Sequence, residues 1–131
     1  MREIKFRAWH KVNKFMQEDL IVNVIVVFSN IEYWELMQFT GLKDMRGNDI
    51  YEGDIIDFIY NPKCLNKNFR GVVELDECYH SIIRVNNVPA DWGCRGIFHI
   101  ENAMNGEVIG NIYENPELLN EVGNETDNKK D

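Results

Sequence analysis

Acidic side chains crowd the segment TGLKDMRGNDIYEGDII (Thr40–Ile56), which lies between two apolar stretches. Five carboxylates lie in this segment or just after it: Asp44, Asp49, Glu52, Asp54 and Asp57. Carboxylates can bind a divalent cation, but their spacing here does not match the fixed offsets of a calcium-binding loop. Asp44 with Gly47 three residues later fits a type I turn, and Gly53 fits a bend that leads into a strand. Turns are therefore the favoured interpretation, and a cation site is the alternative.

Cys78 and His80 stand two residues apart, so on a strand they would face the same side, as two ligands of one zinc ion must. A complete zinc site needs about four ligands. The chain has no Cys-x-x-Cys motif, so Cys94 and His99 would have to converge on the pair from elsewhere. A buried thiol beside an exposed imidazole is the competing interpretation. We expect no metal and no cofactor.

Motifs of nucleophilic catalysis and phosphate binding are missing from the sequence. It contains no G-x-S-x-G elbow, no Walker motif and no G-x-G-x-x-G segment. The two serines, Ser29 and Ser81, lie in ordinary strand or turn contexts. We therefore expect a protein that is not an enzyme. The weakest alternative is a metal-assisted hydrolase centred on Cys78, His80 and the acids near Asp54.

Basic and aromatic residues alternate near the N-terminus, within REIKFRAWHKVNK (Arg2–Lys14). On a strand, such residues can stack bases and bind phosphates, as small β-barrels do with single strands. More commonly, the aromatic face of such a strand lies in the core and the Lys/Arg face lies in water. Arg7 and Trp9, with Trp92 in an evident loop, form the candidate interaction surface. A loop tryptophan can equally plug the open end of a sheet.

The composition suits one domain with a sizeable core, because the chain has 131 residues, of which 44% are hydrophobic. The net charge of −8 argues against bulk binding of nucleic acid, since such affinity comes from basic side chains that release counterions. Half of this charge lies from Glu114 to Asp131, where six acidic residues accompany two basic ones. A protein partner or self-association is therefore expected, with nucleic acid disfavoured.

No secretory signal is visible at the N-terminus, and the longest apolar run, Leu20–Phe28, has nine residues. A transmembrane helix needs about 20 apolar residues, so no membrane association is expected. The three cysteines are widely spaced and suit reduced thiols better than a disulfide framework. These features predict a cytoplasmic protein.

Alternating and β-branched residues predict strands along most of the chain. The expected strands are 2–9, a return strand that begins with Phe15 and Met16, 20–28, 54–60, 70–77 and 79–86. The segment SNIEYWELMQFT (Ser29–Thr40) is ambiguous. Ser29 with Glu32 can form a capping box for a short helix, whereas the aromatic residues favour a strand, which is the preferred interpretation.

The C-terminal third carries turn and helix signals. Asn105-Gly106 readily adopts a type I′ turn and predicts a hairpin between the flanking apolar segments. NPELLNEV (Asn115–Val122) predicts a short helix with Asn115 as N-cap and Pro116 at the first position. The expected fold is mainly β: a small antiparallel, partly barrel-like sheet domain over residues 1–121, with a short C-terminal helix, followed by a disordered acidic tail over 122–131.

Three blocks of sequence stand out together: REIKFRAW (Arg2–Trp9), LMQFTGLKDMRGNDIYEGDII (Leu36–Ile56) and EVIGNIYENPELL (Glu107–Leu119). In combination they resemble the YopX family of phage and prophage proteins. The resemblance implies a cytoplasmic protein of mainly β fold, encoded by a phage or prophage, and supplies no activity. One departure is His10, since the family usually has Asp after the first tryptophan. If an acid there were catalytic, this chain would lack it.

The leading hypothesis is a non-catalytic accessory protein that binds a partner or associates with itself in the host bacterial cell. Edge strands that can pair between subunits support the second possibility. The alternatives are a small-barrel protein that binds nucleic acid through the Arg2–Lys14 surface, and an acidic inhibitor that mimics DNA and binds a host DNA-binding protein.

Overall fold

The computed structural model describes residues 5–18, 32–60, 67–76, 80–86 and 96–119. Its strands are β1 (Phe6–His10), β2 (Phe15–Gln17), β3 (Trp34–Lys43), β4 (Asp49–Tyr51), β5 (Asp54–Tyr60), β6 (Lys67–Leu75), β7 (Ser81–Arg84), β8 (Ile97–His99) and β9 (Gly106–Asn111). A 3-10 helix, η3 (Ile100–Asn105), lies between β8 and β9. The predicted mainly β fold is confirmed.

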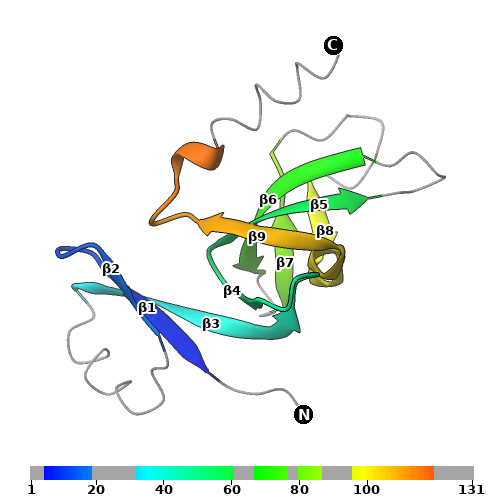
Figure 1. Cartoon of the computed structure of the whole chain (residues 1–131). Helices are drawn as coiled ribbons and strands as arrows, with labels where there is room; N and C mark the ends of the chain where they lie inside the picture. Colours follow the sequence, from blue (N-terminus) through cyan, green and yellow to red (C-terminus); the bar gives the residue numbers. More distant parts are fainter. Residues whose placement is uncertain (1–4, 19–31, 61–66, 77–79, 87–95, 120–131) are drawn as a thin grey trace.

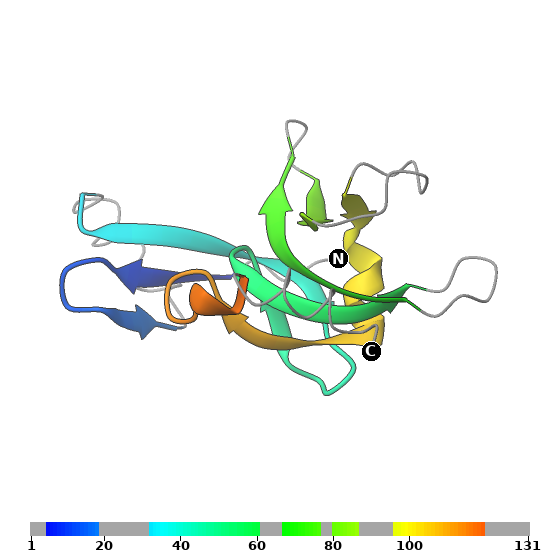
Figure 2. The same cartoon turned by 90° about the horizontal axis from the view of Figure 1, so that it is seen from above.

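The strands form two antiparallel sheets (Figure 1). One has the order β2-β1-β3-β4 and the other has the order β8-β7-β6-β5-β9. Figure 2 shows β6 bending strongly, so that the five-stranded sheet curls into a half-barrel, while β1 and β2 extend to one side. The predicted partly barrel-like arrangement is therefore correct. None of the helical segments in the described part of the chain has the length and apolar character needed to cross a membrane.

Strand β5 is the centre of the fold because it pairs with both β6 and β9. Its neighbouring residues Ile55 and Ile56 are both 0% exposed, so both faces of the strand are covered. Eight buried residues form the main core: Ile50, Ile56, Phe58, Val73, Ile83, Val85, Phe98 and Ala103. The β-branched and aromatic residues that predicted the strands thus fill the half-barrel.

Most of the predicted strands within the described residues are confirmed, with small shifts at their ends. β5 has the predicted bounds, and β6 and β7 replace the expected strands at 70–77 and 79–86. For Ser29–Thr40 the strand interpretation is correct over its described part, because β3 begins at Trp34 and continues to Lys43. The strand expected over 20–28 lies outside the described residues.

The predicted hairpin at Asn105-Gly106 is wrong. β8 pairs with β7 and β9 pairs with β5, so the two strands lie at opposite edges of the five-stranded sheet, joined by η3. Gly106 has an extended backbone with φ −139°, not the positive φ of a type I′ turn. A Cβ at this position would lie 2.2 Å from the Asp57 carbonyl oxygen. The glycine therefore permits close approach to β5 and does not make a turn.

The start of the predicted C-terminal helix is confirmed, because residues 117–119 have helical backbone. The amides of Leu118 and Leu119 donate to the carbonyls of Asn115 and Pro116. The side chain of Asn115 accepts a hydrogen bond from the Asn111 amide, at 3.2 Å, and so ties the turn after β9 to the helix start. The tail expected over 122–131 lies outside the described residues.

Candidate interaction surface

The turn predicted at Asp44 is confirmed. The Gly47 amide donates to the Asp44 carbonyl at 3.0 Å, and Gly47 has φ +86°. The Asp44 carboxylate accepts from the amides of Arg46, Asn48 and Val108, the last at 2.8 Å. Burial alone would raise the pKa of Asp44, but these backbone donors lower it overall. Asp44 thus stabilises its own turn and joins this turn to β9.

Other acids of this region each have a separate structural partner. Asp49 binds Lys5 and Lys43, and the Glu52 carboxylate accepts from the Gln38 amide at 2.8 Å. Asp57 forms a two-point contact with Arg70, with N–O distances of 2.6 and 3.1 Å. Within the described residues, no group of three or more His, Cys, Asp or Glu side chains could hold a metal ion.

The proposed Cys78–His80 zinc pair is only half described. His80 Nδ1 lies 3.7 Å from an oxygen of Asp76, and the His80 side chain is exposed. Cys78 and Cys94 lie outside the described residues, so the zinc alternative is not tested and the expectation of no metal stays a prediction.

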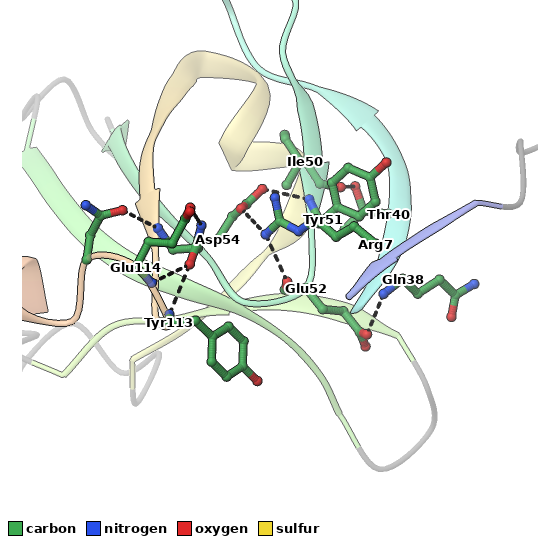
Figure 3. Close-up of polar contacts among 11 residues, drawn as sticks. Arg7, Gln38, Thr40, Ile50, Tyr51, Glu52, Asp54, Tyr113 and Glu114 are labelled. Atoms are coloured by element: carbon green, nitrogen blue, oxygen red, sulfur yellow. Dashed lines mark hydrogen bonds and ion pairs between the residues drawn. The ribbon is translucent and has the colours of Figure 1, made fainter. Parts of the chain in front are cut away.

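The buried ion pair between Arg7 and Asp54 connects the two sheets (Figure 3). Arg7 lies on β1 and its Nη2 donates to Asp54 Oδ1 at 2.5 Å. The other Asp54 oxygen accepts from the Tyr51 amide at 2.7 Å. The Arg7 guanidinium also lies 4.5 Å from the centre of the Tyr51 ring, in a cation–π arrangement.

The electrostatics of this pair are governed by burial. Burial raises the pKa of Asp54 to about 6, although Arg7 and the Tyr51 amide both act to lower it. Arg7 Nε is buried without a hydrogen-bond partner in the described part of the chain. The two oxygens of Asp54 are both engaged by the protein. The arrangement therefore joins the sheets, with each Asp54 oxygen accepting a hydrogen bond from the protein.

Two of the three residues predicted to form a contact surface are buried. Arg7 and Trp9 are each 7% exposed, and the Trp9 ring stacks on Tyr113 with 6.0 Å between centroids. Their face of β1 packs against the half-barrel, so the Lys/Arg side of this strand does not lie in water as expected. Trp92 lies outside the described residues.

Exposed and half-buried aromatic side chains lie instead on the other face of the N-terminal sheet. His10, Phe15, Tyr33 and Trp34 form what we call the aromatic patch. The His10 ring is nearly parallel to Phe15 and Tyr33, with centroids 5.2 and 6.3 Å apart, and Trp34 meets His10 edge-on at 4.6 Å. Phe15 is 41% exposed and Tyr33 is 47% exposed. Val12, which lies in the β1–β2 turn, is also exposed.

The strand register creates the aromatic patch. His10 is paired with Phe15 on β2 and with Trp34 on β3, so the three side chains emerge on the same face. From residue type alone, Phe15 and Tyr33 could have been named as candidate contact residues. That they lie close together follows only from the pairing of β1 with β2 and β3.

Charges of both signs surround the aromatic patch. Lys11 lies 3.4 Å from Glu35, with the two side chains 42% and 45% exposed. Lys14, Glu18 and Glu32 are also exposed. A surface with central aromatic rings and a rim of mixed charge has the anatomy of a protein–protein contact, whereas a phosphate-binding surface requires a basic rim.

Comparison with known proteins places the chain in a family. A family model described as "YopX protein" matches residues 19–120. The chain belongs to the YopX family. The matched range contains the second and third of the sequence blocks that resembled YopX proteins, while the first block precedes it. No curated protein matches this YopX chain.

A solved structure has a similar fold. It is the crystal structure of protein EF1440 from Enterococcus faecalis, which is 25% identical in sequence to this YopX chain. The similarity covers 91% of this chain and 99% of that one, with a TM-score of 0.58.

Proposed function

We propose that this YopX-family protein is a non-catalytic binding module, encoded by a phage or prophage, that contacts a protein through its aromatic patch in the cytoplasm of the host bacterium. The observation that carries this proposal is the exposure of Phe15 and Tyr33 within a cluster of stacked rings. The partner is a different protein or a second copy of this chain.

Stacked rings are suited to binding because their geometry is already ordered. His10, Phe15 and Trp34 contact one another in the protomer, so a partner that covers them restricts little further side-chain motion. Aromatic side chains also dominate the energy of protein interfaces when they lie near the centre and polar groups surround them.

The acids of the Thr40–Ile56 segment support a non-catalytic role. Asp44 and Asp54 accept backbone and guanidinium hydrogen bonds, and Asp49 is held by two lysines. Each carboxylate thus has a role in stability. The best-defined acidic cluster of the sequence needs no catalytic role to explain it.

The test is affinity capture from lysates of infected or induced host cells with the wild-type protein and two matched variants. The double variant Phe15→Ser/Tyr33→Ser alters the aromatic patch, whereas Ile97→Ser/Met104→Ser removes two equally exposed apolar side chains elsewhere. We expect a partner that is retained by the wild type and the control variant and is lost from the patch variant. A partner captured equally by all three proteins contradicts the proposal.

Binding of single-stranded nucleic acid is a second candidate, favoured by the parallel rings of the aromatic patch beside Lys11 and Lys14. Fluorescence anisotropy with labelled oligonucleotides at low and physiological salt tests it. Binding that weakens with salt and is lost in both Tyr33→Ala and Lys14→Glu would favour this candidate over a protein partner. Arg7→Glu is unsuitable as a probe because Arg7 is buried against Asp54.

A further inference from the structure

The His10 ring closes the turn between β1 and β2 through a contact with the backbone. The Asn13 amide donates to His10 Nδ1 at 3.0 Å, and the Lys14 amide donates to the His10 carbonyl at 2.8 Å. Lys14 has φ +58°, a left-handed backbone conformation that residues other than glycine rarely adopt. The two hydrogen bonds therefore hold the turn in a conformation that the residues of the turn do not favour by themselves.

The direction of the Asn13 hydrogen bond defines the protonation state of the ring. A backbone amide can only donate, so Nδ1 accepts and carries no proton. In neutral imidazole the other ring nitrogen, Nε2, then carries the hydrogen. In the imidazolium ion both nitrogens are donors, so a proton on Nδ1 places one N–H group against another. The contact between His10 and Asn13 is thus compatible only with the neutral ring.

The aromatic contacts of His10 do not require a neutral ring. His10 stacks on Phe15 and Tyr33, and Trp34 meets it edge-on. A cationic ring is also attracted to aromatic faces, so these neighbours can retain His10 in either state. The hydrogen bond from Asn13 is therefore the contact that protonation breaks.

The charged and titratable side chains around His10 come from three described parts of the chain. They are Lys11 and Lys14 in the turn, Glu18 after β2, and Glu32, Tyr33 and Glu35 around the start of β3. Glu35 pairs with Lys11. Within the described ranges, none of the three carboxylates forms an ion pair with the His10 ring. A charged ring thus shares the turn with two ammonium groups and has no carboxylate partner among these residues.

We propose that His10 makes the β1–β2 turn sensitive to pH: the neutral ring keeps the turn closed, and protonation of Nδ1 releases the Asn13 amide to water. Histidine side chains commonly change charge between about pH 5 and 8. The turn is exposed, so water can replace the ring as acceptor. Mild acid therefore loosens the turn beside the aromatic patch. This inference goes beyond the proposed function, because it concerns the free protein whether or not the patch binds a partner.

The experiment is NMR spectroscopy of the full chain, labelled with nitrogen-15, in a titration from about pH 8 to about pH 5. At the upper end we expect the nitrogen shifts of a ring with an unprotonated Nδ1 and a protonated Nε2. As the ring gains a proton, the protection of the Asn13 amide against hydrogen exchange should fall about tenfold, after correction for the intrinsic dependence of exchange on pH. The coupling constant that reports φ of Lys14 should lose its left-handed value.

Two variants separate the ring from the acceptor. His10→Phe keeps an aromatic ring but has no acceptor, so the Asn13 amide should be about tenfold less protected than in the wild type near pH 8. His10→Asn keeps a side-chain acceptor that does not titrate, so the protection of Asn13 should not depend on pH. The matched control His99→Asn removes an exposed imidazole on β8 and should leave the pH response of Asn13 unchanged. Circular dichroism verifies that each variant is folded.

Any of three results would overturn the proposal: a His10 ring with a proton on Nδ1 near pH 8, a wild-type Asn13 amide whose protection does not change over the titration, or a folded His10→Asn variant that loses this protection in acid as the wild type does. The first two results are measured on the wild type alone, so they are decisive even if a variant does not fold.

Discussion

Arg7 on β1 and Asp54 on β5 are 47 residues apart in sequence, yet their side chains form a buried ion pair with an N–O distance of 2.5 Å. This contact connects the four-stranded sheet to the half-barrel. Because both side chains are buried, removing either partner leaves the charge of the other unpaired in the interior.

We expect Arg7→Met to lower the free energy of unfolding at pH 7 by about 3 to 5 kcal/mol, since it leaves the Asp54 carboxylate buried without a counter-charge. The double variant Arg7→Met/Asp54→Asn should regain part of this loss, because no buried charge is left. Urea denaturation followed by circular dichroism measures both. The exposed pair of Lys11 and Glu35 is the control, and Lys11→Gln should cost less than about 1 kcal/mol. Equal losses in Arg7→Met and Lys11→Gln would contradict the structural role of the buried pair.

Stability should also depend on pH through Asp54. Its pKa in the folded state is raised from 3.8 to about 6, so the folded protein holds this proton more tightly than the unfolded chain. The contribution of Asp54 is therefore fully present below about pH 4 and is lost as the pH rises through 6, with a total change of about 3 kcal/mol. Urea denaturation of wild type and Asp54→Asn at several pH values isolates this group. We expect the free energy of unfolding of the wild type, relative to that of Asp54→Asn, to decrease between pH 4 and 6. If the two proteins instead show the same dependence of this free energy on pH, Asp54 does not titrate in that range.

Two glycines should differ in their tolerance of alanine. A Cβ at Gly106 would lie 2.2 Å from the Asp57 carbonyl oxygen, whereas Gly47 has nothing within 4 Å but has φ +86°. Gly47→Ala should cost about 1 kcal/mol from backbone strain alone. Gly106→Ala should cost about 3 kcal/mol, because β9 must move away from β5. Thermal denaturation compares the stability of the two variants. A smaller loss of stability for Gly106→Ala than for Gly47→Ala would show that β9 approaches β5 less closely than in this structure.

Arg70 and Arg84 provide a matched pair of strand arginines. Arg70 binds the Asp57 carboxylate at two points, and Arg70 Nη1 donates to the Leu118 carbonyl at 3.0 Å. The Arg70 side chain is 12% exposed. Arg84 binds Glu74 with its side chain 45% exposed. Arg70→Ala should cost about 1 to 3 kcal/mol and speed hydrogen exchange around Leu118. Arg84→Ala should cost less than about 1 kcal/mol without that exchange effect. Similar losses in both variants would rule out the anchoring role of Arg70.

Local features of the fold could be predicted from the sequence. The turn at Asp44 and Gly47 requires only one carboxylate and one glycine at the correct spacing, and β5 requires only a run of apolar and β-branched residues. Both depend on neighbours within a few residues, so one segment of sequence contains the whole signal.

Features that depend on distant partners could not be predicted. Arg7 was expected in water because its counter-charge is on a strand far along the chain. The prediction of a hairpin at Asn105-Gly106 was wrong because the position of β9 is determined by its close approach to Asp57 and Phe58 on β5. The aromatic patch arises from the register of β1 with β2 and β3, and single-residue periodicity does not specify register.

The position of β9 has a consequence for synthesis of the protein. β9 is the last of the described strands to leave the ribosome, yet it completes the hydrogen bonding of β5, in which Ile55 and Ile56 are both 0% exposed. Until residues 106–111 emerge, β5 is an unprotected edge in the nascent chain, and the Asp44 carboxylate lacks the Val108 amide. Chains released before this point would expose an apolar edge and aggregate, so the half-barrel is complete only after residues 106–111 have been made.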